Sequence, residues 1–172
     1  MLDISRFSSR FRVRRMTDAD ADAILAFCLQ NTVYYRYCGK DPSRDLILQD
    51  LRITPPHTRS DAKYYVGFYE GDTLVALLDL IDGYPAPQDA FIGFFMMNAR
   101  LQGRGLGSAI VQELLDRLKS VGFSCVRLGI DKGNPQSTHF WIKNGFRVIR
   151  EVQQAEGSIL LAERRLYRNE PL

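Results

Sequence analysis

The chain has 172 residues, of which 45% are hydrophobic, and a formal net charge of +3 from 23 basic and 20 acidic residues. This length fits one domain with a single core, covering residues 1–172. The small basic excess does not indicate nucleic-acid binding, and no apolar run approaches the roughly 20 residues of a membrane span. Because a signal-peptide core is also missing, we expect a cytoplasmic protein that does not bind membranes.

The first half of the chain predicts a strand and two helices. Residues 11–16 form the strand, and residues 17–20 resemble a capping box that opens the first helix. The tyrosine-rich residues 34–37 interrupt the helical pattern. A second helix is expected from about Ser43 until Pro55-Pro56 closes it.

Three strands follow before the most informative segment of the chain. Residues 63–70 and 73–81 are expected to be two strands, and Gly71-Asp72 between them is a hairpin-turn signal. Residues 90–97 are the next expected strand.

After this strand comes a glycine-rich loop, Gln102-Gly103-Arg104-Gly105-Leu106-Gly107-Ser108, which opens an amphipathic helix ending near Gly122. Glycines let the backbone approach a ligand closely, and a helix N-terminus presents unpaired amides to an anion such as pyrophosphate. The loop lacks the lysine of a Walker A motif, and Ser108 stands where a dinucleotide fingerprint needs a third glycine.

The last third of the chain predicts a strand over residues 125–130 and a short helix opened by Asn134. Two strands over residues 147–152 and 158–167 close the chain around a polar turn. The three cysteines, Cys28, Cys38 and Cys125, have no metal or redox spacing, so we expect reduced thiols and no metal site.

Two blocks of this sequence resemble the GNAT superfamily of N-acetyltransferases. The first is Gln-x-x-Gly-x-Gly at Gln102, Gly105 and Gly107; the second runs from Asn134 to Gly145-Phe146, one helix and one strand later. The resemblance implies an α+β (α/β) fold. It has a central mixed, mostly antiparallel sheet of six to seven strands, flanked by about four helices and splayed between strands four and five.

The resemblance also implies acetyl-CoA as the cofactor, with its pyrophosphate in the glycine-rich loop and its pantetheine along the fourth strand. The backbone amide of Met97 would polarise the thioester carbonyl. The implied cofactor-binding residues are Phe95, Met96, Met97, Gln102, Gly103, Arg104, Gly105, Leu106, Gly107, Ser108, Asn134, Ser137, Phe140 and Trp141.

Trp141 departs from the family pattern, in which many members carry a tyrosine thought to protonate the departing thiolate. An indole N–H does not titrate near neutral pH and cannot be that acid. The proton then comes from water or from another tyrosine, such as Tyr34 or Tyr35. Alternatively, Trp141 is an ordinary packing residue. Helical spacing puts Trp141 on the same face as Asn134 and Ser137, with His139 roughly opposite.

An amine must lose its proton before it attacks, because a lysine-like amine with a pKa near 10.4 is only about 0.1% neutral at pH 7.4. The glutamate that some family members place in the fourth strand is missing here. Asp79, Asp82 and Asp89 are the candidate bases. Asp79 interrupts an apolar run, so it is either a base that contacts the acceptor or a solvent-facing residue of an edge strand.

The resemblance implies an acceptor site between the first two helices, where Tyr34 and Tyr35 either contact the substrate or anchor the core. The sequence thus predicts an acetyl-CoA-dependent N-acetyltransferase, which moves acetyl to a primary amine of a small molecule or peptide by direct attack in a ternary complex. The alternative is a CoA-binding sensor or structural module with little transferase activity. The protein is expected to be a monomer or a homodimer.

Overall fold

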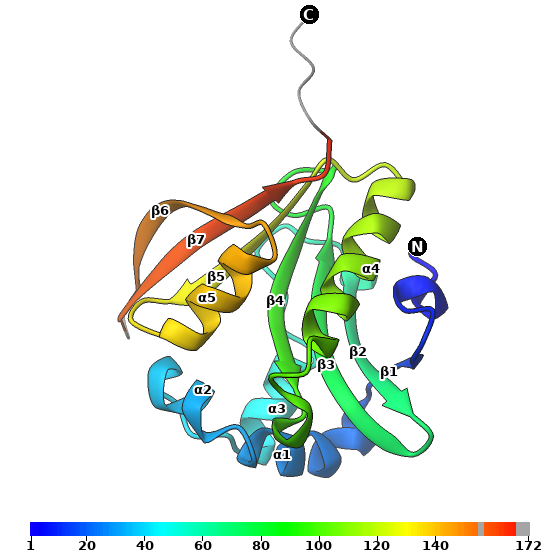
Figure 1. Cartoon of the computed structure of the whole chain (residues 1–172), viewed down its shortest axis with the longest axis vertical. Helices are drawn as coiled ribbons and strands as arrows, with labels where there is room; N and C mark the ends of the chain where they lie inside the picture. Colours follow the sequence, from blue (N-terminus) through cyan, green and yellow to red (C-terminus); the bar gives the residue numbers. More distant parts are fainter. Residues whose placement is uncertain (155–156, 168–172) are drawn as a thin grey trace, which may run out of the picture.

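A seven-stranded sheet organises the computed structural model, which describes residues 1–154 and 157–167 (Figure 1). The spatial order is β1-β2-β3-β4-β5-β7-β6, and β4 with β5 is the parallel pair among otherwise antiparallel neighbours. The strands are β1 (Arg12–Arg15), β2 (Lys63–Glu70), β3 (Thr73–Asp82), β4 (Asp89–Met97), β5 (Cys125–Asp131), β6 (Arg147–Gln154) and β7 (Gly157–Arg165). The predicted mixed, mostly antiparallel sheet is confirmed. The polar turn expected between the last two strands lies partly outside the described residues.

The described residues form five α-helices, one more than the sequence predicts. They are α1 (Ala21–Leu29), α2 (Thr32–Cys38), α3 (Arg44–Asp50), α4 (Leu106–Ser120) and α5 (Pro135–Lys143), with short 3₁₀ turns at Ile4–Phe7, Asp18–Asp20, Ser60–Ala62 and Ala99–Leu101. The expectation that residues 34–37 interrupt a helix was wrong, because they lie within α2. A helix of two turns is too short to show periodicity and depends on tertiary packing, which Tyr34 and Tyr35 supply.

Two apolar cores hold the helices on opposite faces of the sheet. One core lies between the sheet and α4 with α5, and includes Leu78, Leu114 and Trp141. The other lies under α1 and α3, and includes Ile24, Ile47 and Leu77. Leu77 and Leu78 enter different cores because successive side chains of a strand point to opposite faces.

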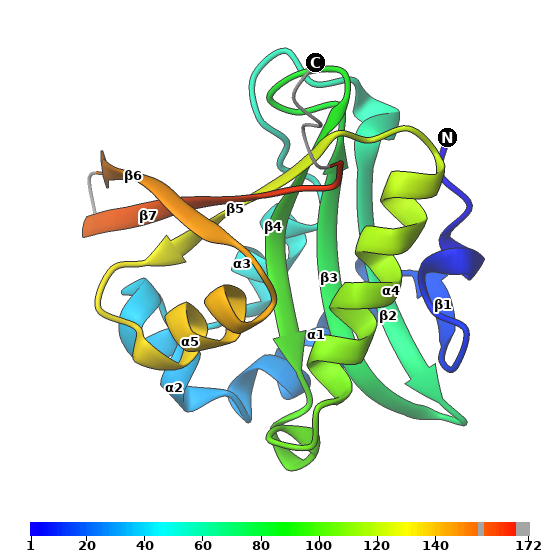
Figure 2. The ribbon, with the colours of Figure 1, turned by 45° about the horizontal axis from the view of Figure 1, so that its top comes forward.

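The sheet opens between β4 and β5. These strands pair only where residues 89–92 face residues 125–128, and beyond that point they diverge, as Figure 2 shows. On its other side β5 stays paired with β7 through Asp131. The predicted splay between the fourth and fifth strands is therefore confirmed, and it leaves one edge of β4 unpaired from Gly93 onward.

None of the helices in the described part of the chain is both long and apolar enough to cross a membrane.

Candidate active site

A cleft with a volume of about 800 Å³ occupies the place where β4 and β5 separate. Its walls come from β4, the glycine-rich loop, the start of α2 and one face of α5. The predicted site residues that line it are Tyr34, Phe95, Met96, Met97, Gln102, Gly103, Gly105, Gly107, Ser108, Asn134, Ser137, Phe140 and Trp141. The other predicted residues, Tyr35, Asp79, Arg104 and Leu106, lie outside this lining.

The free edge of β4 offers backbone groups to the cleft. The amide of Asn98 donates to the carbonyl of Val75 on β3 at 2.8 Å. Because backbone groups alternate between the two edges of a strand, the amides of Phe95 and Met97 point away from β3, into the gap that β5 vacates. The amide of Met96 points toward β3 instead, so Met96 meets the cleft through other atoms.

The glycine-rich loop has the backbone that a phosphate cradle requires. Gly103 and Gly105 have positive φ angles of 74° and 78°, and α4 begins at the next residue, Leu106. A side chain at Gly107 would come within 3.1 Å of Met97 Cγ, so the helix packs closely against β4 at this residue. The amides in the first turn of α4 have no partner within the helix, and they fit the pyrophosphate of the expected cofactor.

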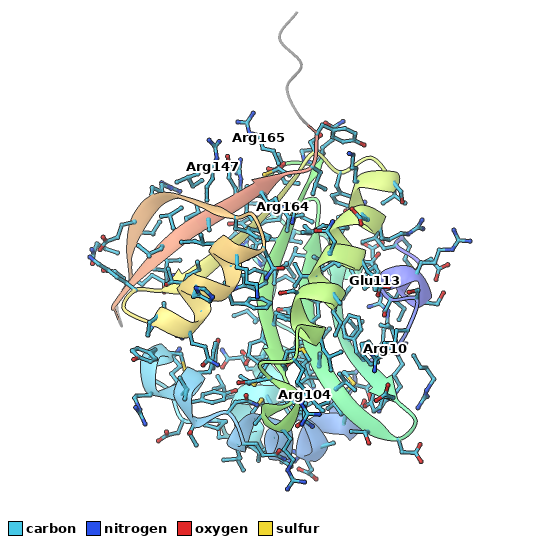
Figure 3. The ribbon with its side chains drawn as sticks, viewed as in Figure 1. Arg10, Arg104, Glu113, Arg147, Arg164 and Arg165 are labelled. Carbon is cyan, nitrogen blue, oxygen red and sulfur yellow. The ribbon has the colours of Figure 1, made fainter. Side chains whose placement is uncertain are left out.

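Two of the predicted loop residues, Arg104 and Leu106, do not line the cleft. Arg104 lies on the loop at the N-terminal end of α4, without lining the cleft (Figure 3). Leu106 packs against the core beneath α4.

Hydrogen bonds of the Gln102 side chain connect different walls of the cleft. Its Nε2 donates to Asn31 Oδ1 at 2.7 Å and to the carbonyl of Met97 at 3.3 Å, while Gln136 Nε2 donates to Gln102 Oε1 at 3.1 Å. Sequence reasoning missed Asn31 and Gln136, and no local pattern marks Asn31, which lies 71 residues from Gln102. The loop thus joins α5 to the end of α1.

Asn134 both lines the cleft and caps α5. It is buried, and its Oδ1 accepts a hydrogen bond from the amide of Ser137 at 3.1 Å. His139, which helical spacing places on the opposite face, is exposed and lies at the rim of the same cleft.

Substituting Asn134 by alanine is expected to lower the free energy of unfolding by about 1 kcal/mol, because the cap is lost. Ser43→Ala removes a similar cap from α3, where Ser43 accepts from the amide of Leu46. Urea denaturation should show similar losses in both variants, and calorimetry should show weaker CoA binding for Asn134→Ala alone. Equal CoA affinities would mean that Asn134 serves only as a cap.

Trp141 packs among aromatic rings and also lines the cleft. Its ring centroid lies 5.9 Å from Phe95, 5.0 Å from Phe140 and 5.1 Å from Phe146, and only 6% of the residue is exposed. Trp141 is therefore a packing residue, and its small remaining surface faces the cleft.

Asp79 is buried in the interior of the sheet, not exposed on an edge strand. Only 9% of it is exposed, and its Oδ2 accepts a hydrogen bond from Lys63 Nζ at 2.7 Å. Its other oxygen, Oδ1, is buried without a hydrogen-bond partner among the described residues. Burial outweighs the attraction of Lys63 and raises the pKa of Asp79 to about 6.

The carboxylate of Asp79 lies directly behind the cleft wall. The strand β4 bulges opposite Asp79, and a side chain at Gly93 would lie 2.7 Å from Asp79 Oδ2. Gly93 lines the cleft and Asp79 does not, so the carboxylate lies next to a wall residue that has no side chain. Asp82 and Asp89 do not line the cleft, and Asp89 lies 3.6 Å from Arg127 in an ion pair.

The two predicted acceptor tyrosines are placed differently. Tyr34 lines the cleft, and its ring centroid lies 5.0 Å from that of Tyr35 and 5.5 Å from that of Phe94. Tyr35 is half-buried, packs against the core under α1 and α3, and does not line the cleft.

Thiol chemistry is not available in this cleft. None of the three cysteines lines it, and burial raises the pKa of Cys28 to about 11. Burial also raises the pKa of Cys38 and of Cys125. All three thiols therefore stay protonated and poorly nucleophilic near neutral pH.

A model of the Acetyltransferase (GNAT) family matches residues 26–146, which include the β4 edge, the glycine-rich loop and α5. The chain belongs to this family. It is accordingly an acyltransferase, and acetyl-CoA is its cofactor. A sequence search of curated proteins found no match.

Solved structures of acetyltransferases share this fold across nearly their whole length. An acetyltransferase from Thermus thermophilus is 22% identical, with a TM-score of 0.69 over 90% of this chain and 96% of its own. A GCN5-related N-acetyltransferase from Kribbella flavida is 25% identical, with a TM-score of 0.64 over 91% and 98%. The PaiA N-acetyltransferase from Thermoplasma acidophilum, solved with coenzyme A, is 17% identical, with a TM-score of 0.65 over 90% and 98%.

Proposed function

We propose that this GNAT acetyltransferase moves the acetyl group to a primary amine by direct attack in a ternary complex. The observation that carries the proposal is the carboxylate of Asp79 next to Gly93, the residue at which one edge of β4 becomes free. A base and an oxyanion donor would then meet at the point where the sheet opens.

Acetyl-CoA supplies the activated thioester, and residues of the chain would bind it, stabilise the developing charge and accept the proton of the amine. The amides of the glycine-rich loop would hold its pyrophosphate. The amide of Phe95, which points into the gap two residues from Gly93, would donate to the thioester oxygen as negative charge develops there. The amide of Met97 lies about 13 Å from Gly93 along β4 and would bind the pantetheine nearer the glycine-rich loop. Asp79 would accept the proton of the attacking amine, through a water molecule if the amine stays on the cleft side of Gly93.

The proton for the departing thiolate would come from Tyr34 or from water, since Trp141 cannot supply it. Tyr34 is the better placed of the two candidate tyrosines because it lines the cleft and Tyr35 does not. Burial raises the pKa of Tyr34, so its hydroxyl stays protonated at neutral pH.

The positions and the raised pKa values of the three cysteines also support direct attack. A covalent acetyl intermediate would need a thiolate in the cleft, and the three described thiols lie outside its lining with raised pKa values.

The test is release of the CoA thiol, followed with DTNB, when the protein and acetyl-CoA meet a panel of alkyl amines, amino acids and peptides. We expect turnover that depends on the amine, with the acetylated product visible by mass spectrometry. Tight CoA binding without turnover on any amine would favour the alternative, a CoA-binding sensor that keeps the cradle and has lost transfer.

A further inference from the structure

Asp131 ends β5 at the open part of the cleft. It is half-buried and lines the cleft, and α2 lies beside this end of β5, below α5, in both views (Figures 1 and 2). On β5, Leu128 and Ile130 point into the core under α4 and α5. Strand alternation therefore turns Asp131 toward the opposite face, the face on which Asp79 and Tyr34 also lie.

The carboxylate of Asp131 has no counter-charge of its own within the described part of the chain. It makes no hydrogen bond or ion pair there, and the neighbouring Lys132 pairs instead with Glu151 at 2.8 Å. Asp131 is the one acidic residue among the described residues that line the cleft. A lone carboxylate beside a site for a polyanionic cofactor is unfavourable unless a cation lies next to it.

Tyr34 makes this end of the cleft suitable for an ammonium group. Tyr34 and Asp131 both line the cleft, and after burial the charge of Asp131 contributes most to the raised pKa of Tyr34. An aromatic face next to a carboxylate attracts an alkylammonium ion through both cation–π and ionic interactions.

The distance from the reacting position points to a second positive charge, not the reacting amine itself. The last parallel pair joins Ile92 to Leu128, so Gly93 lies level with Gly129. Asp131 is two residues further along β5, so it lies at least about 7 Å from this level at the usual rise of a strand, and the divergence of the two strands adds to that distance. An amine that reacts near Gly93 would carry a second ammonium about this far away.

We infer that Asp131, with Tyr34, binds the distal ammonium of a diamine acceptor, so that the enzyme selects diamines over monoamines. This inference rests on the proposed function for the identity of the reacting end. The binding site for the distal ammonium can be measured separately from transfer.

The experiment compares cadaverine with pentylamine, which differ by one terminal ammonium. Isothermal titration calorimetry on the CoA-saturated protein should show cadaverine binding at least about tenfold more tightly. Asp131→Asn should abolish that preference, since the amide keeps the shape but loses the charge. Asp72→Asn, in the turn between β2 and β3 and outside the cleft lining, is the matched control and should preserve the preference.

The outcomes separate the inference from the proposed function. Equal binding of the two amines to the unaltered protein, or a preference that survives in Asp131→Asn, overturns the inference even if both amines are acetylated. A preference that disappears in Asp131→Asn supports it, even if DTNB detects no thiol release, in which case the proposed transfer alone fails.

Discussion

Asp79→Asn is expected to lower kcat by roughly 100- to 10,000-fold, the usual effect of losing a general base. The asparagine keeps the size of the side chain at β3 but cannot accept a proton from the amine. CoA affinity should be unchanged, because Asp79 does not line the cleft that would hold the cofactor. DTNB kinetics and CoA calorimetry on the same preparation measure the two effects. A kcat within threefold of the unaltered protein would remove Asp79 from the mechanism.

The buried partner of Asp79 requires a second variant. Asp79→Asn leaves the Lys63 ammonium buried beside a neutral amide, which destabilises a fold by about 3–5 kcal/mol when an ion pair is broken this way. The double variant Lys63→Met with Asp79→Asn removes both charges and should fold with near-normal stability. Its kcat should stay low, which would show that the lost activity does not come from unfolding.

The pH profile of the unaltered enzyme provides an independent check. Since the pKa of Asp79 is raised from 3.8 to about 6, kcat/KM should fall about tenfold per pH unit below pH 6 as the base is protonated. The linkage to stability has the opposite sign. The native state holds this proton more tightly than the unfolded state, so the stability contributed by the protonated carboxyl is lost as pH rises from about 4 to 6. Tryptophan fluorescence should therefore show a folded protein where activity falls. In Lys63→Met the acid limb should move to higher pH, because Lys63 lowers the pKa of Asp79.

Gly105→Val is expected to weaken CoA binding about 100-fold. Gly105 has a φ of 78° and open space around its Cα, in the loop that would cradle the pyrophosphate. A branched side chain both strains this backbone and fills the space that the phosphate needs. Losing two charge-assisted hydrogen bonds of about 1.5 kcal/mol each corresponds to this change in affinity.

Gly71→Val is the control matched to Gly105→Val. Gly71 also has a positive φ, 58°, with no atom near its missing side chain, but it lies in the turn between β2 and β3. Both variants should lose about 1–3 kcal/mol of stability to backbone strain. Calorimetry with CoA should separate them, with Gly71→Val binding normally. If both variants bind CoA normally, Gly105 does not belong to the cradle.

The glycine-rich loop and α5 could be predicted from the sequence because each depends on residues that are close together in the chain. The glycines of the loop lie within one turn, and the block from Asn134 to Phe146 spans one short helix. The spacing of these residues in the sequence therefore predicts their local backbone structure. The hairpin at Gly71-Asp72 and the buried face of α4 were predictable for the same reason, since a turn type and a helical period are short-range properties.

The short helix α2 marks the limit of such patterns. Its seven residues, Thr32–Cys38, contain a run of tyrosines that reads as an interruption, yet the chain turns helical there because Tyr34 and Tyr35 pack against the core under α1 and α3. That packing surface is assembled from distant segments and has no signature in residues 32–38 themselves.

The amino-acid sequence by itself was enough to predict the fold class, the family and the glycine-rich loop that opens α4, because these depend on residues close together in the chain. The catalytic side of the cleft needed the tertiary structure. Asp79 comes to lie behind Gly93 only through the register of β3 with β4 and a one-residue bulge. Asp131 and Tyr34 line the same cleft only because β5 diverges from β4 beyond Leu128. Strand register and divergence arise from packing across the whole sheet, so no short pattern specifies them.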